Sequence, residues 1–395
     1  MPVWERVGWA VAAALLVSLA VRSAVGTIVV PRGVPNRLTR VVFVVVLSVF
    51  RLRVHLLPRR RRDSETGRDR VLVFFAPTAL LTLQGVWLLI TAAAAVCAFR
   101  ALGTPPVRSV QYAGSALTTL GFSEPAGLGG HLVAFGTAGT GLALLTLLIT
   151  YLPSLYAAFS RREQLVRKLE VRAGSPPSGV ALLERSVEAG REAALAQVWR
   201  DWEDWFVDLE ESHTSFAALA FFRSPTASLS WVTAGGAILD AAALLLAVRG
   251  DPRRLRVTTL AEEDLDVADP VGAEVCLRSG ALALRRIASY YALPLPTPGH
   301  VELFVSREEF CEVYDRLAAG PVLVDVLPDD AWEAFQNWRG RYDAPLVELA
   351  ALVQAPPAPW SGDRAGRARG RGLTLRVRQI DEDPQVEDLV LHRED

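Results

Sequence analysis

The apolar residues of this chain are concentrated in its first 160 positions. Three long apolar runs occur there, at Val7–Val30, Val71–Phe99 and His131–Phe159. A helix needs about 20 residues to cross hydrocarbon of about 30 Å, so each run can span a membrane. Positions 161–395 carry most of the acidic residues, with shorter apolar stripes at helical spacing. The pattern predicts an all-α membrane protein whose membrane half precedes an all-α cytoplasmic domain.

The charges around the first apolar run predict its orientation. Glu5 and Arg6 cancel each other before the run, whereas three arginines follow it, at Arg32, Arg37 and Arg40. Basic residues collect on the cytoplasmic side of membrane helices, so the N-terminus is expected outside. A cleaved signal peptide is the competing interpretation, but the residues before the run are not basic. We therefore expect an N-terminal transmembrane helix within 1–30.

Basic residues precede the second run and follow the third. The second run is entered from an arginine-rich segment, and the third is followed by Arg161 and Arg162. Both ends are therefore expected in the cytoplasm, and positions 100–130 are expected to face outward. The sequence thus predicts a multi-pass protein with its N-terminus outside and its C-terminus in the cytoplasm.

A basic segment, 31–70, separates the first two runs. Its apolar residues recur at helical spacing, but the uninterrupted core Val41–Phe50 is too short to cross the membrane. We expect an amphipathic helix on the cytoplasmic membrane surface. Arginines within 51–62 would attract anionic lipid headgroups, each contributing about 1 kcal/mol. A solvated basic loop is the alternative, and it gives the same topology.

A short polar stretch lies between the second and third runs. Residues 107–118 can form a half-helix that enters the bilayer, and residues 119–123 can follow it as non-helical backbone. Such backbone is tolerated at that depth only where protein buries it or water bathes it. Gly121 supplies the conformational freedom that outward-facing carbonyls require. Glu124 then leads the chain back to the surface.

Glycines are frequent at the start of the third run. They stand at Gly136, Gly139 and Gly141. Small residues permit close helix packing, which is the favoured interpretation, and a glycine can also serve as a gating hinge.

The filter-like sequence Thr118-Thr119-Leu120-Gly121-Phe122 between two spanning runs resembles the selectivity filter of the bacterial potassium channel family. The surrounding residues 71–160 resemble the two-helix pore module of that family, with an outer helix at 71–99, a pore helix at 107–118, a filter at 119–123 and an inner helix at 131–159. The ending from Tyr151 to Glu163 is similar to that of members with a helical cytoplasmic extension.

This resemblance implies a pore that passes K⁺ through rings of backbone carbonyls, with no cofactor besides the permeant ion. It also implies four copies of the chain around one axis, a homotetramer. The ion sites would be lined by the carbonyls of Thr119, Leu120, Gly121 and Phe122, with the hydroxyl of Thr119. Thr118 would end the pore helix, whose C-terminal dipole favours a cation. Glu124 would stand at the filter exit.

Two positions depart from the family pattern: Glu124 stands where aspartate is usual, and the second departure bears on selectivity. Ser123 stands where a second glycine is usual, and serine adopts a left-handed backbone only at a steric cost. A less selective monovalent-cation channel is therefore an alternative to a potassium channel. A membrane-anchored scaffold or sensor with a degenerate pore is another.

The cytoplasmic half is predicted to hold a helical domain at 161–292, a second helical part at 293–360 and a mobile tail at 361–395. An aromatic stripe between Leu195 and Leu209 is interpreted as core. The run Trp231–Val248 is nearly long enough to span a membrane, but we interpret it as a buried core helix. Crossing the membrane there would export the acidic remainder of the chain.

Composition excludes several other functions. The net charge of −1 gives no excess of basic surface for nucleic acid, and the 3 cysteines show no zinc or disulfide spacing. A single lysine, Lys168, among 42 lysines and arginines is typical of a GC-rich bacterial genome, which favours a bacterial cytoplasmic membrane.

A polar cluster, Glu210, Glu211 and His213, is the main candidate for a metal site or an enzyme. Arg223 and Asp240 follow in the same region. The sequence offers neither a paired histidine at ligand spacing nor a nucleophile motif. We interpret these residues as helix caps or a buried polar network, and we expect no enzyme.

Overall fold

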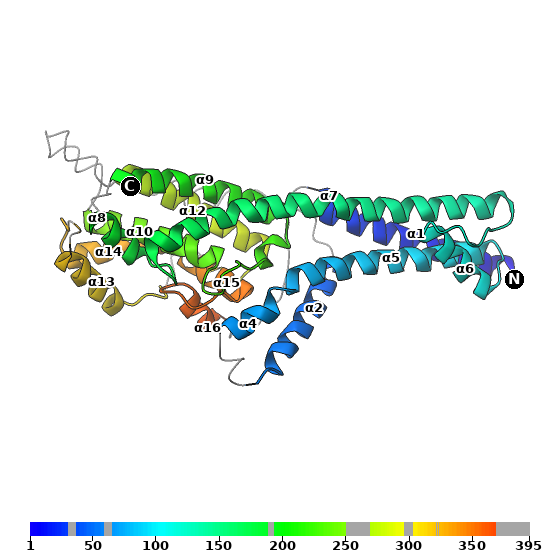
Figure 1. Ribbon diagram of the computed structural model, residues 1–395, viewed down its shortest axis with the longest axis horizontal. Coiled ribbons are helices and arrows are strands. Elements are labelled where there is room, and N and C mark those ends of the chain that lie inside the picture. Colours follow the sequence, from blue (N-terminus) through cyan, green and yellow to red (C-terminus); the bar gives the residue numbers. More distant parts are fainter. Residues whose placement is uncertain are drawn as a thin grey trace. The chain divides into compact units, whose positions relative to one another are not determined.

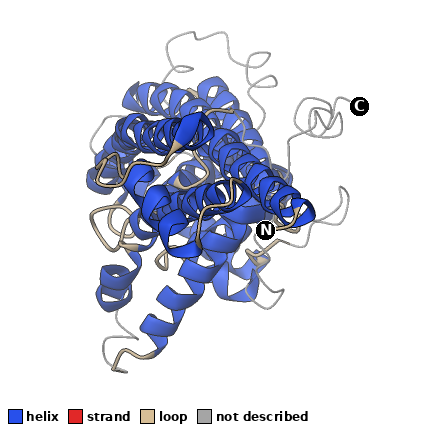
Figure 2. Ribbon diagram, turned by 90° about the vertical axis from the view of Figure 1, so that its right-hand side faces the viewer, coloured by secondary structure: helices blue, strands red, loops and turns tan. Residues whose placement is uncertain are grey.

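The computed structural model describes residues 1–30, 37–58, 65–188, 193–249, 269–295, 303–320, 322 and 324–368. Within these ranges the chain forms helices joined by turns and loops, with no strand (Figure 2). The prediction of an all-α protein is confirmed for this part of the chain. The arginine run 59–62, residues 296–302 and residues 369–395 of the predicted tail 361–395 lie outside the described residues.

Contacts divide the chain into two compact units. Unit 1 comprises Met1–Leu56 and Phe74–Ala157, and unit 2 comprises Leu57–Val73 and Ala158–Asp395. The helix α7 (Gly127–Ala173) contributes residues to both units.

Unit 1 is built around two long apolar helices, α1 (Val3–Ile28) and α5 (Phe75–Ala101), which pack side by side (Figure 1). They run antiparallel, because Arg6 Nε donates to the carbonyl of Ala101 at 2.8 Å and Trp87 Nε1 donates to Ser23 Oγ at 2.9 Å. Small residues on the buried face of α1 permit the close approach, namely Ala13, Ala20, Ser23 and Ala24.

The amphipathic helix expected in the basic segment is present as α2 (Arg37–His55), which packs on α5. Phe43 and Phe50, two turns apart, both place their rings edge-on against Phe75, with centroids 6.2 and 6.0 Å away. One apolar face of α2 is thereby buried against the beginning of α5.

The second apolar run begins later than the sequence predicts. The short helix α4 (Glu65–Leu72) ends before a turn at Val73 and Phe74, and α5 starts after it. Pro77 then falls in the first turn of α5, where a missing backbone N–H leaves no helical hydrogen bond unmade. A continuous helix would have carried this proline in its interior.

Four helical stretches of the described residues are long and apolar enough to cross a membrane: Val3–Ile28, Gly67–Ala101 (α5 with most of α4 before it), Gly127–Ala173 and Trp231–Arg249. They indicate a membrane-embedded protein. Their most apolar windows differ sharply in burial, at 28%, 39% and 22% for the first three and 100% for the last. Most of each of the first three windows is therefore not covered by the described chain, whereas the last is enclosed by protein.

Unit 2 surrounds this enclosed helix, α10 (Trp231–Arg249), in which every residue from Trp231 to Val248 is buried. The burial agrees with the interpretation of this run as a core helix. The helices around α10 are α8 (Gly179–Glu188), α12 (Pro270–Tyr290), α14 (Pro328–Arg339) and α15 (Asp343–Val353). Gly179 must be a glycine for this packing, since a Cβ there would lie 2.6 Å from the amide nitrogen of Ala241.

The remaining elements of unit 2 are α9 (Ala193–Ser215), η1 (Leu219–Phe221), α13 (Arg307–Ala319), η2 (Gly362–Arg364) and α16 (Ala365–Ala368). The aromatic stripe of α9 is buried as predicted, with Trp199 and Phe206 fully enclosed. A capping box begins α13, because Ser306 and Glu309 exchange hydrogen bonds with each other's backbone amides.

Candidate pore loop

The half-helix expected between the second and third runs is present as α6 (Pro106–Leu117). Pro106 occupies its first turn, where the fixed φ of proline suits a helix start. The helix packs on α5 through Ala113 and through Tyr112, whose ring lies 5.4 Å from that of Phe99. Val133 and Ala134 of α7 close the same apolar cluster. The end of α6 is thus held between two long helices.

The glycines of α7 differ in their surroundings. A Cβ on Gly141 would lie 2.7 Å from the Leu117 side chain and 3.2 Å from its carbonyl oxygen, so α7 touches the last residue of α6 there. A Cβ on Gly136 or Gly139 would meet no described atom within 4 Å. Of these three glycines, only Gly141 is therefore required for close packing within one chain.

The backbone after α6 has an unusual conformation. Thr118 caps the helix with right-handed dihedrals, and its hydroxyl donates to the carbonyl of Gly114 at 2.7 Å. Thr119 then has φ 57° and Gly121 has φ 67°. A positive φ is ordinary for glycine, but for a β-branched residue it is an outlier that costs free energy. Such strain persists where the surroundings enforce it, and it is typical of functional sites.

The positive φ values stand at alternate residues, with Leu120 between them. A selectivity filter coordinates a dehydrated cation through backbone carbonyls, so the backbone conformation of these residues is the feature that bears on an ion site.

The returning chain is tied to α6 through Ser115, a residue that the sequence analysis did not single out. Its buried hydroxyl accepts a hydrogen bond from the Ser123 amide at 3.0 Å, and its carbonyl accepts one from Gly121 at 3.4 Å. The sequence does offer one signal for Ser115. It is a hydroxyl in the last turn of the predicted half-helix, close to a loop whose backbone needs hydrogen-bond partners.

The predicted filter residues are open in the single chain. The side chains of Leu120 and Phe122 are 72% and 65% exposed, and Thr118, Thr119 and Glu124 are exposed as well. Ser123 is half-buried. The loop therefore presents polar backbone on the surface of a unit whose helices are apolar.

The alternative polar cluster does not converge on one site. Glu210 pairs with Arg286 at 3.1 Å, Glu211 is exposed, and His213 is fully buried. Among the residues that the structure describes, no group of three or more His, Cys, Asp or Glu could hold a metal ion.

His213 belongs to a buried network around Arg162 of α7. Its Nδ1 donates to the carbonyl of Leu209 at 2.9 Å, which leaves Nε2 to accept from Arg162 Nη1 at 3.2 Å. Burial and the neighbouring guanidinium lower the pKa of His213 well below its ordinary value of 6.5. The imidazole is therefore neutral, and the prediction of a buried polar network is confirmed for this residue.

A second buried network joins Asp240 of α10 to α14 and α15. Arg339 donates to Asp240 and, at 2.7 Å, to Asp343, while the Tyr342 hydroxyl donates to Asp240 at 2.8 Å. Burial opposes the charge on Arg339, but the two carboxylates outweigh it and raise its pKa. The network leaves no accessible acid or base.

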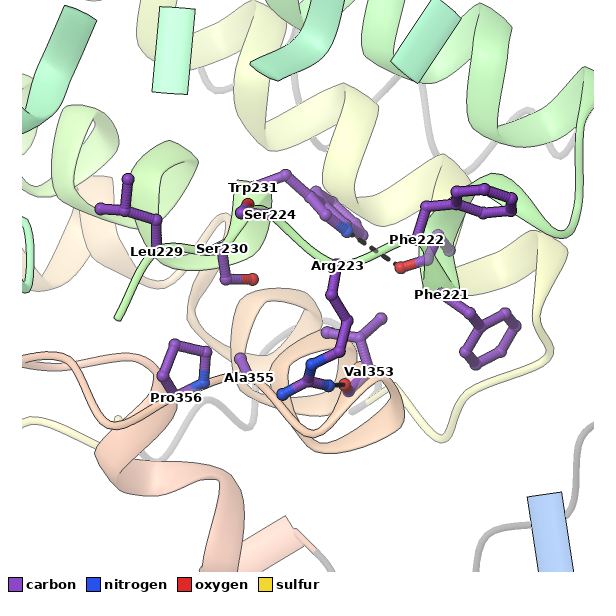
Figure 3. Close-up of a pocket in the computed structure, with 11 residues that line it drawn as sticks. Phe221, Phe222, Arg223, Ser224, Leu229, Ser230, Trp231, Val353, Ala355 and Pro356 are labelled. Atoms are coloured by element: carbon purple, nitrogen blue, oxygen red, sulfur yellow. Dashed lines mark hydrogen bonds between the residues drawn. The ribbon is translucent and has the colours of Figure 1, made fainter. Parts of the chain in front are cut away.

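Arg223 forms a third network at the edge of a small cavity, which is shown in Figure 3. Its guanidinium donates to Asp69 of α4, to the carbonyl of Val353 at 2.9 Å and to that of Gln354 at 3.0 Å. The cavity volume of about 20 Å³ suits a single water molecule. We therefore find no room there for a substrate.

The fold and the loop define an all-helical membrane protein with a strained polar loop between two helices of spanning length. Comparison of the chain with models of known protein families, with curated proteins and with solved structures finds no match.

Proposed function

We propose that this chain is one subunit of a channel that passes K⁺ across a membrane, with the carbonyls of Thr119, Leu120, Gly121 and Phe122 lining the ion sites. The observation that carries this proposal is the positive φ of Thr119, directly after a half-helix that lies between two apolar helices. That conformation is costly for a β-branched residue, and locally it is offset only by hydrogen bonds such as that of the Thr119 hydroxyl to the carbonyl of Thr118 at 2.7 Å. We infer that this conformation, together with the positive φ of Gly121, serves to turn carbonyls toward an ion on one side of the loop.

The dipole of α6 supports the same proposal. The C-terminal end of a helix carries a partial negative charge of about half an electron. In α6 this end leads directly into Thr118 and Thr119. Four such ends around an axis would stabilise a cation on that axis without any acidic side chain.

A tetramer would account for the exposure of the loop. Polar backbone at membrane depth needs cover from protein or water, and a single loop cannot enclose a pathway. Four copies around an axis would give Leu120 and Phe122 neighbours and would leave the carbonyl side to the ion. Gly136 and Gly139, which have open space beside them, would then face neighbouring copies or the pore.

The strictness of selection for K⁺ over Na⁺ depends on the outer end of the loop. Ser123 replaces a glycine there, and its amide is bound by Ser115. This bond holds the peptide group through α6, so the outer end can keep one conformation without a second glycine. A less selective monovalent-cation channel remains the competing form of the proposal.

Potassium flux into proteoliposomes tests the channel. Gly121→Ala is expected to abolish flux, because alanine at φ 67° is strained. Gly114→Ala is the matched control, since its added Cβ would meet no described atom within 4 Å. Both variants are first compared with the unaltered protein for tetramer formation in detergent. Tetramers of the unaltered protein that pass no monovalent cation would overturn the proposal and favour a scaffold or sensor.

We also propose that α2 contacts anionic lipid at the cytoplasmic face. Beside the face that packs on α5, it has a second, exposed apolar stripe formed by Val41, Val45, Val49 and Leu52, which Leu56 continues just after the helix. Arginines stand at both ends of the helix, and α2 contains no acidic residue. An apolar stripe with basic ends suits the boundary between acyl chains and anionic headgroups.

Spin labels on adjacent residues test this contact in vesicles with and without anionic lipid. The background replaces Cys97, Cys276 and Cys311 by serine. A label on Val45→Cys, 56% exposed, is expected to be reached by oxygen and shielded from a water-soluble nickel chelate. A label on Val46→Cys, 7% exposed, should be reached by neither. Access of the chelate to the first label would support the solvated loop instead.

A further inference from the structure

The last turns of α7 are bound to a short segment of unit 2, Leu219–Arg223, which we name the 219–223 segment. It comprises η1 and the two residues that follow it. Arg162 Nη1 donates to the carbonyl of Leu219 at 3.0 Å, and Nη2 donates to that of Phe222 at 2.7 Å. The ring of Phe222 also packs against Phe159, with centroids 5.8 Å apart.

The side chain of Arg162 is shielded from solvent. It is 1% exposed, and its other partners are Glu163 at 2.8 Å and the imidazole of His213. The guanidinium also lies over the ring of Phe159, 5.2 Å from its centroid. Breaking its bonds to the 219–223 segment would leave a buried charge partly unpaired, which is strongly unfavourable. The end of α7 and this segment are therefore expected to move together.

The same segment holds α4 on its other side. Arg223 donates through Nε to Asp69 of α4, and both side chains are 15% exposed. Its two terminal nitrogens bind the carbonyls of Val353 and Gln354, at the end of α15. The planar fork of arginine allows these three directions at once, which a lysine cannot reproduce.

The two elements bound by the 219–223 segment are α4 and the end of α7. In the sequence they adjoin the two predicted pore helices. Only Val73 and Phe74 separate α4 from α5, the predicted outer helix. The α7 residues around Arg162 continue the predicted inner helix. The carbonyls of the 219–223 segment thus bind the continuation of one pore helix, while its arginine binds the helix that precedes the other.

We propose that the 219–223 segment couples the approach to the outer helix to the end of the inner helix, so that a displacement of either one is passed to the other. A role of this segment in regulating ion flux rests on the proposed channel function. The mechanical coupling within unit 2 does not require that function and can be measured without ion flux.

Hydrogen exchange of the full-length protein in detergent tests the coupling. Asp69→Asn removes the charge of the α4 partner and leaves every contact of Arg162 in place. We expect amide exchange to rise about tenfold in α4 and also in residues 158–173 of α7. Arg286→Gln is the matched control, because it removes an ion pair of unit 2, with Glu210, that does not involve the segment. It should leave exchange in α4 and in 158–173 unchanged.

Two exchange results would overturn the coupling. Either α4 loosens alone, which would show that the segment does not pass the change to α7, or neither element responds to Asp69→Asn. Arg223→Gln provides a second variant, with the same response expected in both elements. Flux through the tetramer is then compared for Asp69→Asn and Arg286→Gln, and only the first should change it. Absence of flux in the unaltered tetramer would overturn the channel, while the exchange data would still decide the coupling.

Discussion

The backbone amide of Ser123 donates a 3.0 Å hydrogen bond to the hydroxyl of Ser115, eight residues earlier in the chain. The bond joins the returning arm of the loop to the last full turn of α6. It holds the peptide group of the residue that stands where a second glycine is usual in potassium channel filters. The conformation of the loop thus depends on a side chain of the half-helix as well as on the loop's own residues.

Ser115→Ala is predicted to lower the selectivity of the channel for K⁺ over Na⁺. The Ser123 amide would lose its partner, and an unsatisfied donor costs about 1–3 kcal/mol where it is shielded from water. The loop should then sample other conformations. Bi-ionic permeability ratios measure the effect, with Ser109→Ala as control.

Ser109 suits that control because it is equally buried and lies on the same helix, with its hydroxyl bonded at 3.0 Å to the carbonyl of Pro105. Its loss disturbs the start of α6 and not the loop. An unchanged permeability ratio in Ser115→Ala, with flux retained, would show that the bond does not set selectivity.

The glycines of α7 are predicted to respond differently to alanine. Gly141→Ala would bring a methyl group too close to the side chain and the backbone carbonyl of Leu117. Because the backbone carbonyl cannot move aside freely, the substitution should destabilise the protein by about 1–3 kcal/mol. The end of α6 would shift, and both thermal stability and flux should fall. Gly139→Ala would meet no described atom of its own chain within 4 Å, so it should leave the contact between α6 and α7 intact and favour the helical backbone by up to about 1 kcal/mol.

Thermal unfolding in detergent, followed by flux in liposomes, separates packing from hinge action. A stable Gly139→Ala tetramer with altered opening would assign the hinge to that residue. Equal stability of Gly141→Ala and the unaltered protein would contradict the contact with Leu117.

Local patterns predicted several helices of this protein. A helix at 106–117 occupies the place of the predicted half-helix 107–118, and the buried core helix also follows from spacing. Each of these depends on residues within a few turns of one another, which periodicity and capping rules describe. The sequence analysis missed the break before α5, although Pro77 was visible.

Pairings between distant residues could not be predicted in this way. Arg162 and His213 are 51 positions apart, and Arg223 and Asp69 are 154 apart. Nothing in the periodicity of a helix specifies which distant partner its polar residues meet. The loop conformation lies between these cases, since Gly121 suggested a left-handed residue but threonine at position 119 did not.

Acidic pH is predicted to destabilise unit 2 through His213. An unfolded histidine has a pKa of about 6.5, and the folded value is lower. Above pH 6.5 neither state is protonated there, and the stabilisation is fully present. Below it, the unfolded chain binds a proton that the folded chain does not, which removes about 1.4 kcal/mol per pH unit until the folded pKa is reached.

Comparison with His213→Gln isolates this contribution from that of the carboxylates. The amide oxygen of glutamine can accept from Arg162 but does not titrate. The difference in midpoint temperature between the two proteins, followed by tryptophan fluorescence, should therefore shrink as pH falls from 7.5 to 5.5. A difference that stays constant over that range would contradict a neutral, buried His213.

The network around Arg339 yields a prediction about stability alone. Arg339→Leu would leave the carboxylates of Asp240 and Asp343 buried without their cation, and breaking such a pair costs about 3–5 kcal/mol. Arg339→Lys should rescue little, because a single ammonium cannot reach both carboxylates and the carbonyl of Trp360 together. Arg316→Leu removes an exposed arginine paired with Glu184, so its effect should stay below about 1 kcal/mol. Midpoint temperatures of the three variants measure the ranking. Equal midpoint temperatures for Arg339→Leu and Arg316→Leu would contradict this prediction. They would mean that the two carboxylates are neutral or hydrated in the folded protein, and that water reaches the core around α10 despite its burial.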